Sequence, residues 1–505
     1  MGDEENNLLL EAIGNVASLE VLLVTLAAAC YGLAVGSIPG LTATMAVALM
    51  VPLTAYLSDV QAIAAIVTTV TCSIFAGDLP ATLLRIPGTP ASAAYANDAY
   101  ALTKKGKAKA ALATCLWFSI IGGLFGTLVL ALAAPQLAAL ATQFTSYEYF
   151  WLYVLGLSCA VTVSNDSRLR GMMAMLLGLL LSTVGLATDF STPRMTFGWN
   201  ELITGVHFIP AMIGLFGLSE VLKNILHVPT ASIASDGNAQ VNPNQGIAQV
   251  MQMSWRRKWS TVRSSFIGSL IGMLPGAGAD IASWISYATS KRFSKQPTEY
   301  GKGSEEGLAD ATGANNAALG GAWIPALVFG IPGDSVTAIA LGVLLTKNIS
   351  PGPAIFEASP ENSQLVLVLS LYVVFVLANL MLLPLGLVAI RAGTALVRIP
   401  RNLLLPLIVL FCVVGSYSMS GSYFDVWVML VMGVLGFGLE RLKIPLGPAV
   451  LGLIMGGALE HRFIQSITTS GSLLDFVSRP MAAVLATVCV LLWLGPLLVK
   501  RNADQ

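Results

Sequence analysis

Apolar runs about as long as a bilayer is thick recur along the whole chain, and no other feature limits its possible folds so strongly. A helix needs roughly 20 apolar residues to cross a membrane. Only 11% of the residues are charged, whereas soluble domains carry about 25%. The sequence therefore predicts an all-α, polytopic membrane protein. The long runs are 19–36, 60–77, 108–134, 147–164, 168–187, 201–227, 365–390, 403–420, 423–440 and 480–498.

Shorter apolar pieces lie between these runs and are interrupted by four Pro-Gly pairs: Pro39-Gly40, Pro87-Gly88, Pro275-Gly276 and Pro332-Gly333. Proline removes a backbone donor and breaks a helix. Irregular backbone is tolerated at membrane depth only where protein or a water-filled cavity satisfies its polar groups. Each pair is therefore expected to mark a broken or re-entrant helical hairpin that lines a cavity.

The breaks repeat in one order. Gly36-Ser-Ile-Pro-Gly40 matches Gly272-Met-Leu-Pro-Gly276, and Ile86-Pro-Gly88 matches Ile331-Pro-Gly333. The offsets, 236 from Pro39 to Pro275 and 245 from Pro87 to Pro332, are nearly constant. We therefore expect an internal duplication. The predicted segments are an acidic N-terminal segment (1–18), transmembrane repeat 1 (19–227), a polar cytoplasmic linker (228–262), transmembrane repeat 2 (263–460) and a loop, last helix and basic C-terminus (461–505).

Loop charges suggest how the two repeats are oriented. Lysine and arginine favour the cytoplasmic side of short loops. The lysine-rich loop 104–107 is then cytoplasmic, whereas the corresponding acidic loop 357–361 is extracytoplasmic. The repeats would run in opposite directions, an inverted topology that many secondary transporters share. The linker serves as a plain connector or as a partner-binding loop.

Composition removes other classes of function. The 27 basic residues balance 27 acidic ones, so there is no basic surface for nucleic acid. Six cysteines stand singly in apolar runs, which predicts no metal site, and nothing indicates a cofactor. No phosphate loop or catalytic motif favours an enzyme, and interrupted hairpins suit a closed site better than a channel. The acidic start lacks the basic region of a secretory signal, so the first run is expected to be a permanent helix.

Half-helix N-termini at the breaks would suit an anion, since they carry partial positive charge and unpaired N–H groups. Hydroxyl residues follow both of the matched Ile-Pro-Gly breaks, where they either bind a carboxylate or simply cap the helix. The adjacent amides of Asn315 and Asn316 either bind a solute or form hydrogen bonds between packed helices. The residues expected to bind substrate are Ser37, Pro39, Gly40, Arg85, Pro87, Gly88, Thr89, Ser92, Pro275, Gly276, Asn315, Asn316, Pro332, Gly333, Ser335 and Thr337.

Charged residues beside the breaks have several possible roles. An arginine inside the membrane is a functional hypothesis by default, and Arg85 would clamp a carboxylate, pair with Asp78 or reach out to the interface. Four aspartates are expected as candidates for a coupling H⁺ or Na⁺, and the sequence does not rank them: Asp98, Asp280, Asp310 and Asp334.

Several motifs in order resemble the large membrane subunit of the tripartite tricarboxylate transporters, the TctA family, over nearly the whole chain. The sharpest are Gly272–Ala279 with Ser286-Tyr287, Tyr300–Gly303 with Glu306-Gly307, Ala314–Ala317 with Gly320-Gly321, Gly330–Gly333, and Pro351–Pro353. The chain departs from the family pattern at Arg85, usually apolar, at Ala99, usually Gly, at Ala309-Asp310, usually Pro-Glu, and at Asp280 and Asp334, usually small or hydroxyl residues.

The resemblance implies a secondary transporter that imports an organic di- or tricarboxylate across the cytoplasmic (inner) membrane, driven by a gradient of H⁺ or Na⁺. It implies two protein partners, a small TctB-like membrane subunit and an extracytoplasmic, TctC-like solute-binding protein. A transporter of another small solute without a binding protein is the alternative.

Overall fold

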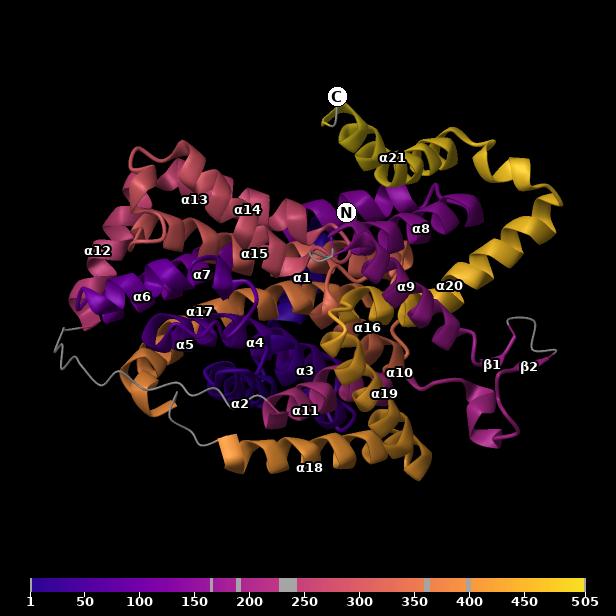
Figure 1. Ribbon diagram of the computed structural model, residues 1–505, viewed down its shortest axis with the longest axis horizontal. Helices are drawn as coiled ribbons and strands as arrows, with labels where there is room; N and C mark the ends of the chain where they lie inside the picture. Colours follow the sequence, from indigo (N-terminus) through magenta and orange to yellow (C-terminus); the bar gives the residue numbers. More distant parts are fainter. Residues whose placement is uncertain are drawn as a thin grey trace.

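The computed structural model describes residues 2–163, 167–187, 192–226, 243–357, 364–396 and 401–503. Helices make up nearly all of its regular structure (Figure 1). In chain order the first elements are α1 (Gly2–Val16), α2 (Leu19–Gly36), α3 (Ala43–Thr54), α4 (Asp59–Ala76), α5 (Asp78–Leu84), η1 (Ser92–Ala94), α6 (Ala96–Lys104), α7 (Ala108–Ala141), α8 (Ser146–Val163), α9 (Arg168–Ser182), β1 (Gly185–Leu186), β2 (Pro193–Arg194), η2 (Asn200–Thr204), α10 (Phe208–Met212), η3 (Ile213–Leu218) and α11 (Ser219–Leu226).

The strands β1 and β2 form a small antiparallel pair at the periphery (Figure 1). The remaining elements are α12 (Pro243–Arg256), α13 (Lys258–Gly272), α14 (Gly278–Phe293), η4 (Pro297–Glu299), α15 (Glu305–Phe329), α16 (Ser335–Thr346), η5 (Pro353–Phe356), α17 (Gln364–Leu396), α18 (Arg401–Ser420), α19 (Tyr423–Arg441), α20 (Leu446–Ser470), η6 (Leu473–Val477) and α21 (Pro480–Ala503).

Within the described residues, six helical segments are long and apolar enough to cross a membrane: Leu19–Gly36, Asp59–Leu84, Ala108–Ala141, Phe208–Ile225, Gln364–Gly393 and Tyr423–Arg441. Shorter apolar helices, such as Ala43–Thr54 and Ser335–Thr346, lie beside the breaks. The prediction of an all-α, polytopic membrane protein is confirmed.

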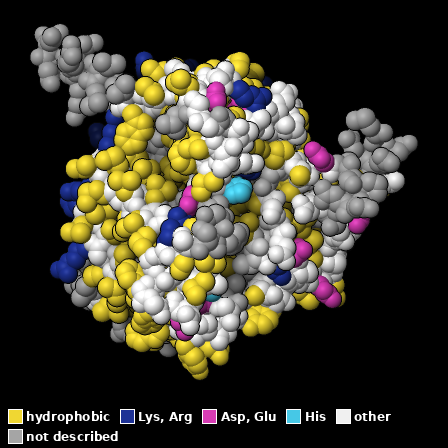
Figure 2. Space-filling model, turned by 90° about the vertical axis from the view of Figure 1, so that its right-hand side faces the viewer, with side chains coloured by type: hydrophobic (Ala, Val, Ile, Leu, Met, Phe, Trp, Pro, Cys, Tyr) yellow, Lys and Arg dark blue, Asp and Glu magenta, His cyan; other side chains and the backbone are white. Residues whose placement is uncertain are grey.

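Hydrophobic side chains also cover much of the outside, as one face of the molecule shows (Figure 2). Leu132 of α7, Val388 of α17 and Val434 of α19 are each more than half exposed. A large apolar surface is unfavourable in water, but it suits the acyl chains of a bilayer. These helix faces are therefore the lipid-facing ones.

Small residues let the central helices approach closely. Helix α15 runs between α7 on one side and α13 and α14 on the other (Figure 1). A Cβ atom added to Gly122 of α7 would lie 2.0 Å from the Gly313 carbonyl oxygen of α15, and one on Gly268 of α13 would lie 2.3 Å from the Ala314 oxygen. Membrane helices associate through such small-residue contacts, since lipid provides no hydrophobic driving force between them.

The second and fourth Pro-Gly breaks share their local geometry. The C-cap residues that follow α5 and α15 are Arg85 (φ 59°) and Gly330 (φ 69°), and both lie in the left-handed region. The Ile86 N–H donates to the Pro80 carbonyl at 3.3 Å, and the Ile331 N–H donates to the Pro325 carbonyl at 3.2 Å. These pairs have the 245-residue offset of the repeated motifs.

Some predicted boundaries fall inside elements. Residue 262 lies within α13, and residue 460 lies within α20, which continues to Ser470. The acidic N-terminal segment forms α1, which packs against α17. Residues 228–242 of the predicted linker and 358–361 of the acidic loop lie outside the described residues.

Candidate functional site

A cavity of about 880 Å³ lies where the broken hairpins meet. The loop between α2 and α3 contributes Gly40, the first turn of α3 contributes Thr44, and the break after α5 contributes Pro87, Gly88 and Thr89. The remaining wall includes Phe216, Ser219, Glu220, Lys223, Gly276, Ala277, Gly278, Asp280, Trp284, Asn315, Asp334, Ser335, Glu440, Lys443 and Pro445–Pro448.

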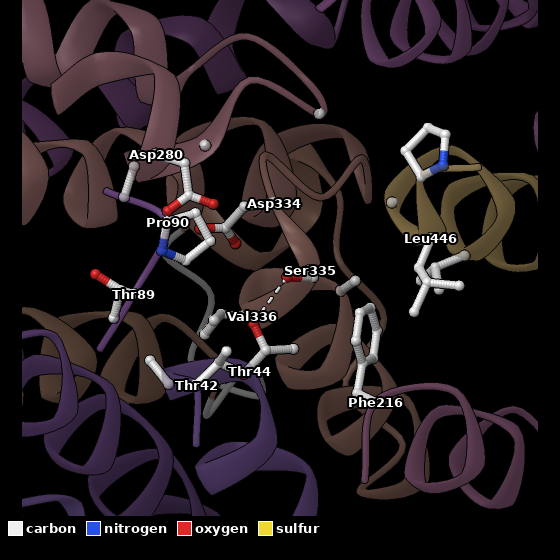
Figure 3. Close-up of a pocket in the computed structure, with 18 of the residues that line it drawn as sticks. Thr42, Thr44, Thr89, Pro90, Phe216, Asp280, Asp334, Ser335, Val336 and Leu446 are labelled. Atoms are coloured by element: carbon white, nitrogen blue, oxygen red, sulfur yellow. Dashed lines mark hydrogen bonds between the residues drawn. The ribbon is translucent and has the colours of Figure 1, made fainter. Parts of the chain in front are cut away.

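Breaks far apart in sequence contact one another around this space. The Gly276 N–H donates to the Gly333 carbonyl at 2.8 Å, which joins the third break to the fourth. The Thr44 and Ser335 hydroxyls, one from each predicted repeat, are 3.0 Å apart (Figure 3). Polar groups that lipid could not satisfy are therefore gathered around one cavity, as the Pro-Gly pairs indicated.

The hydroxyls of the first Ile-Pro-Gly break bond to their own turn. The Thr89 N–H donates to Ser92 Oγ at 3.1 Å, and the Ser92 N–H donates to Thr89 Oγ1 at 3.2 Å. Both side chains are buried, but only Thr89 lines the cavity. These hydroxyls therefore stabilise the turn after the break, and they cap neither η1 nor α6, whose N-termini have no side-chain cap hydrogen bond.

The start of α16 is capped by a charged side chain. Asp334 Oδ1 accepts hydrogen bonds from the Thr337 N–H at 2.8 Å and from Thr337 Oγ1 at 2.7 Å. A carboxylate at this position satisfies free N–H groups and complements the helix dipole. The chain's own carboxylate thus occupies the helix end where a substrate carboxylate was expected.

A second carboxylate lies beside the first. Asp280 stands in the first turn of α14 and is exposed to the cavity. Figure 3 shows the Asp280 and Asp334 side chains next to one another, away from Phe216 and Leu446. Among the described residues no lysine, arginine or histidine forms an ion pair with either.

The two adjacent asparagines differ in position. Asn315 lines the cavity, and its Nδ2 has no hydrogen-bond partner within the described structure. Asn316 is not part of the cavity wall, and both its amide atoms lack partners among the described residues. Each side chain is only 1% exposed. Of the two asparagines, Asn315 is therefore the one in the cavity wall, and its amide nitrogen is buried behind that wall.

The cavity wall also contains a charged group that the sequence did not predict as part of the site. Lys223 of α11 lies 3.2 Å from the Glu220 carboxylate and 3.5 Å from the Glu440 carboxylate of α19. Glu220 and Lys223 stand inside a long apolar run, a signal that could have been used. Their contact with Glu440 joins residues 217 or more positions apart, which no local pattern reports.

Several predicted site residues lie behind the wall rather than on it. Ser37 donates to the Ala34 carbonyl at 2.8 Å, and Thr337 belongs to the α16 cap. Of the predicted substrate-binding residues, those that line the cavity are Gly40, Pro87, Gly88, Thr89, Gly276, Asn315 and Ser335, and those that do not are Ser37, Pro39, Arg85, Ser92, Pro275, Asn316, Pro332, Gly333 and Thr337.

Arg85 lies outside the cavity and is exposed. Its Nε and Nη2 donate to Asn97 Oδ1 at 3.0 and 2.9 Å. Asp78, the partner considered for it, instead accepts a hydrogen bond from the Tyr95 hydroxyl at 2.5 Å. In this structure Arg85 therefore neither faces the cavity nor pairs with Asp78.

Two of the four candidate aspartates serve as structural acceptors. Asp98 accepts from the N–H groups of Gly303 and Ser304 at 2.7 and 2.8 Å, and it ties α6 to the loop before α15. Asp310 Oδ2 accepts from Ser260 and Ser290 at 2.6 Å and lies 3.2 Å from the Arg263 guanidinium. Only Asp280 and Asp334 of the four line the cavity.

Comparison with known proteins shows which family the chain is similar to. The model of the "Tripartite tricarboxylate transporter TctA family" matches residues 22–451. Two similar proteins come from Agrobacterium vitis. The "Uncharacterized 52.8 kDa protein in TAR-I ttuC' 3'region" is 35% identical over 476 residues, which cover 92% of this chain and 91% of that protein. The "Uncharacterized protein in TAR-II ttuC' 3'region" is 37% identical over 242 residues, which cover 47% of this chain and 98% of that protein. No solved structure matches the chain.

Proposed function

This chain belongs to the tripartite tricarboxylate transporter TctA family, and from that premise we propose that it imports an organic di- or tricarboxylate across the cytoplasmic membrane. The family is one of transporter subunits rather than enzymes. The observation that carries the proposal is the cavity of about 880 Å³ formed by breaks from both halves of the chain. Such a central site, built from discontinuous helices, is the usual place for substrate in secondary transporters.

We further propose that import is driven by a gradient of H⁺ or Na⁺ and needs two partners, a small TctB-like membrane subunit and a TctC-like extracytoplasmic binding protein. Asp280 and Asp334 are the two candidate aspartates that an ion or a solute in the cavity can reach. Asp98 and Asp310, held by backbone and side-chain donors, are better suited to joining helices.

An inverted-topology duplication remains our proposal for the architecture. Reciprocal contacts support it. Lys105 Nζ, after α6, donates to the Lys302 carbonyl in the loop before α15 at 2.8 Å. In the other half, Lys347, after α16, donates to the Leu57 carbonyl in the loop before α4. Two units related by a two-fold axis make such exchanged contacts, because each presents the same surfaces to the other.

Reconstituted vesicles test the function. The chain, its small membrane subunit and its binding protein are incorporated together, and uptake of radiolabelled di- and tricarboxylates is measured with H⁺ or Na⁺ gradients. We expect concentrative uptake that collapses when the gradient is dissipated. Uptake that persists without the binding protein would favour the alternative transporter class, and equilibration without concentration would count against secondary active transport.

A further inference from the structure

The charges on the cavity wall do not suit a citrate-like polyanion. Four acidic residues line the cavity, and two lysines accompany them. Lys223 is held by Glu220 and Glu440, and Lys443 follows three residues after Glu440, just past the end of α19. These four residues sum to zero formal charge. The net charge of −2 therefore belongs to Asp280 and Asp334.

The α16 N-terminus is a second reason why the cavity does not suit a polyanion. It is the helix end at which an incoming carboxylate would find free N–H groups. Asp334 Oδ1 already accepts the Thr337 N–H and hydroxyl there. A substrate carboxylate at this position would meet a like charge instead of unpaired donors, and like charges close together are unfavourable.

Asn315 provides the opposite chemistry in the same cavity. Its Nδ2 is buried, and no acceptor among the described residues takes its hydrogens. A buried amide donor without an acceptor is costly, and a carboxylate bound in the cavity would satisfy it. The cavity wall thus combines a buried, unpartnered amide donor with a pair of acceptors that have no counter-cation among the described residues.

We propose that the transported solute carries both a carboxylate and a cationic amino group. The amino group binds between Asp280 and Asp334, and the carboxylate accepts a hydrogen bond from Asn315. This inference rests on the proposed function and narrows its substrate class.

Matched solutes that differ only by an amino group test the proposal. Binding to the purified full chain in nanodiscs, in sodium-free buffer, is measured by titration calorimetry for succinate and L-aspartate, for glutarate and L-glutamate, and for propanoate and β-alanine. We expect the amino-bearing member of at least one pair to bind at least about tenfold more tightly, since charge-assisted hydrogen bonds are strong.

Substitutions then locate the preference. Asp280→Asn and Asp334→Asn each remove a charge, and asparagine at 334 still caps α16. Either change should reduce the amino preference at least about tenfold. Glu305→Gln, an exposed carboxylate paired with Lys107 at 3.6 Å, should leave it unchanged.

Each other outcome has a definite meaning. Equal or tighter binding of the plain carboxylates leaves the proposed function standing and overturns the inference. Binding of Na⁺ alone that both asparagine variants abolish, without any amino preference, also overturns it and makes the pair a coupling-ion site. Failure of every probe to bind the native chain would overturn the inference, whereas the vesicle uptake assay judges the proposed function separately.

Discussion

Neighbouring side chains with the same chemistry have different roles in this protein, and Asn315 and Asn316 show it most directly. Asn315→Leu removes the unpartnered amide donor from the cavity wall. A hydrogen bond to a charged group contributes about 1.5–3 kcal/mol, so substrate affinity should fall roughly tenfold to a hundredfold. Asn316→Leu, outside the cavity wall, should retain uptake and serve as the matched control. Equal loss in both variants would show that the pair acts through packing.

Arg85 provides a second test at this scale, because its φ of 59° lies in the left-handed region that favours glycine. Arg85→Ala and Arg85→Gly both lose the bonds to Asn97, but only the alanine variant keeps a strained Cβ. We expect the glycine variant to be the more stable of the two by about 1 kcal/mol in denaturant unfolding in detergent. Neither variant should change substrate affinity. A weaker affinity in both variants would show that Arg85 takes part in substrate binding.

Glycines, which have no side chain, set how closely the helices of this protein approach one another. A Cβ on Gly122 would lie 2.0 Å from the Gly313 oxygen, so Gly122→Ala must push α7 away from α15. Overpacking typically costs about 1–3 kcal/mol. Gly438→Ala in α19 has nothing within 4 Å and should be neutral or stabilising. Unfolding in detergent compares the two, and equal stabilities would mean that the α7–α15 contact is looser than the structure has it.

For the whole molecule, the proposed alternating access would move the two predicted repeats relative to each other. Thr44 and Ser335 bring them into contact, with hydroxyl oxygens 3.0 Å apart. In a cysteine-free background, the Thr44→Cys, Ser335→Cys pair should cross-link under oxidation. Uptake should then stop and recover on reduction, while each single variant continues to transport. Undiminished uptake by the cross-linked protein would mean that this contact does not open during the cycle.

The orientation of the two repeats is also a property of the whole molecule. Single cysteines at Lys107 and Glu357 should react with an impermeant maleimide from opposite sides of the membrane, because the positive-inside rule places the lysine loop in the cytoplasm. The measurement is made on intact cells and on inverted vesicles. Labelling of both positions from one side would exclude the inverted topology.

The sequence alone was sufficient for the features that depend on local chemistry. Length and apolarity set the membrane-spanning helices, since each must satisfy its own backbone in lipid. Helices expected at 19–36, 60–77 and 108–134 are α2, α4 and α7 in the structure, with boundaries within a residue except at the end of α7. Proline and glycine likewise placed the breaks, because their backbone limits act within one turn.

Only the tertiary structure decided which of the residues near the breaks share a cavity. Adjacent helical residues point in directions about 100° apart, so Asn315 and Asn316 face different sides of α15. Only the packing of α15 decides which of the two sides lines the cavity. The pairing of Asp280 with Asp334, the ion pairs of Lys223 and the outward position of Arg85 all depend on how helices distant in sequence are arranged. Local composition contains no information on those distances, because they are set by small-residue contacts such as that of Gly122 with Gly313.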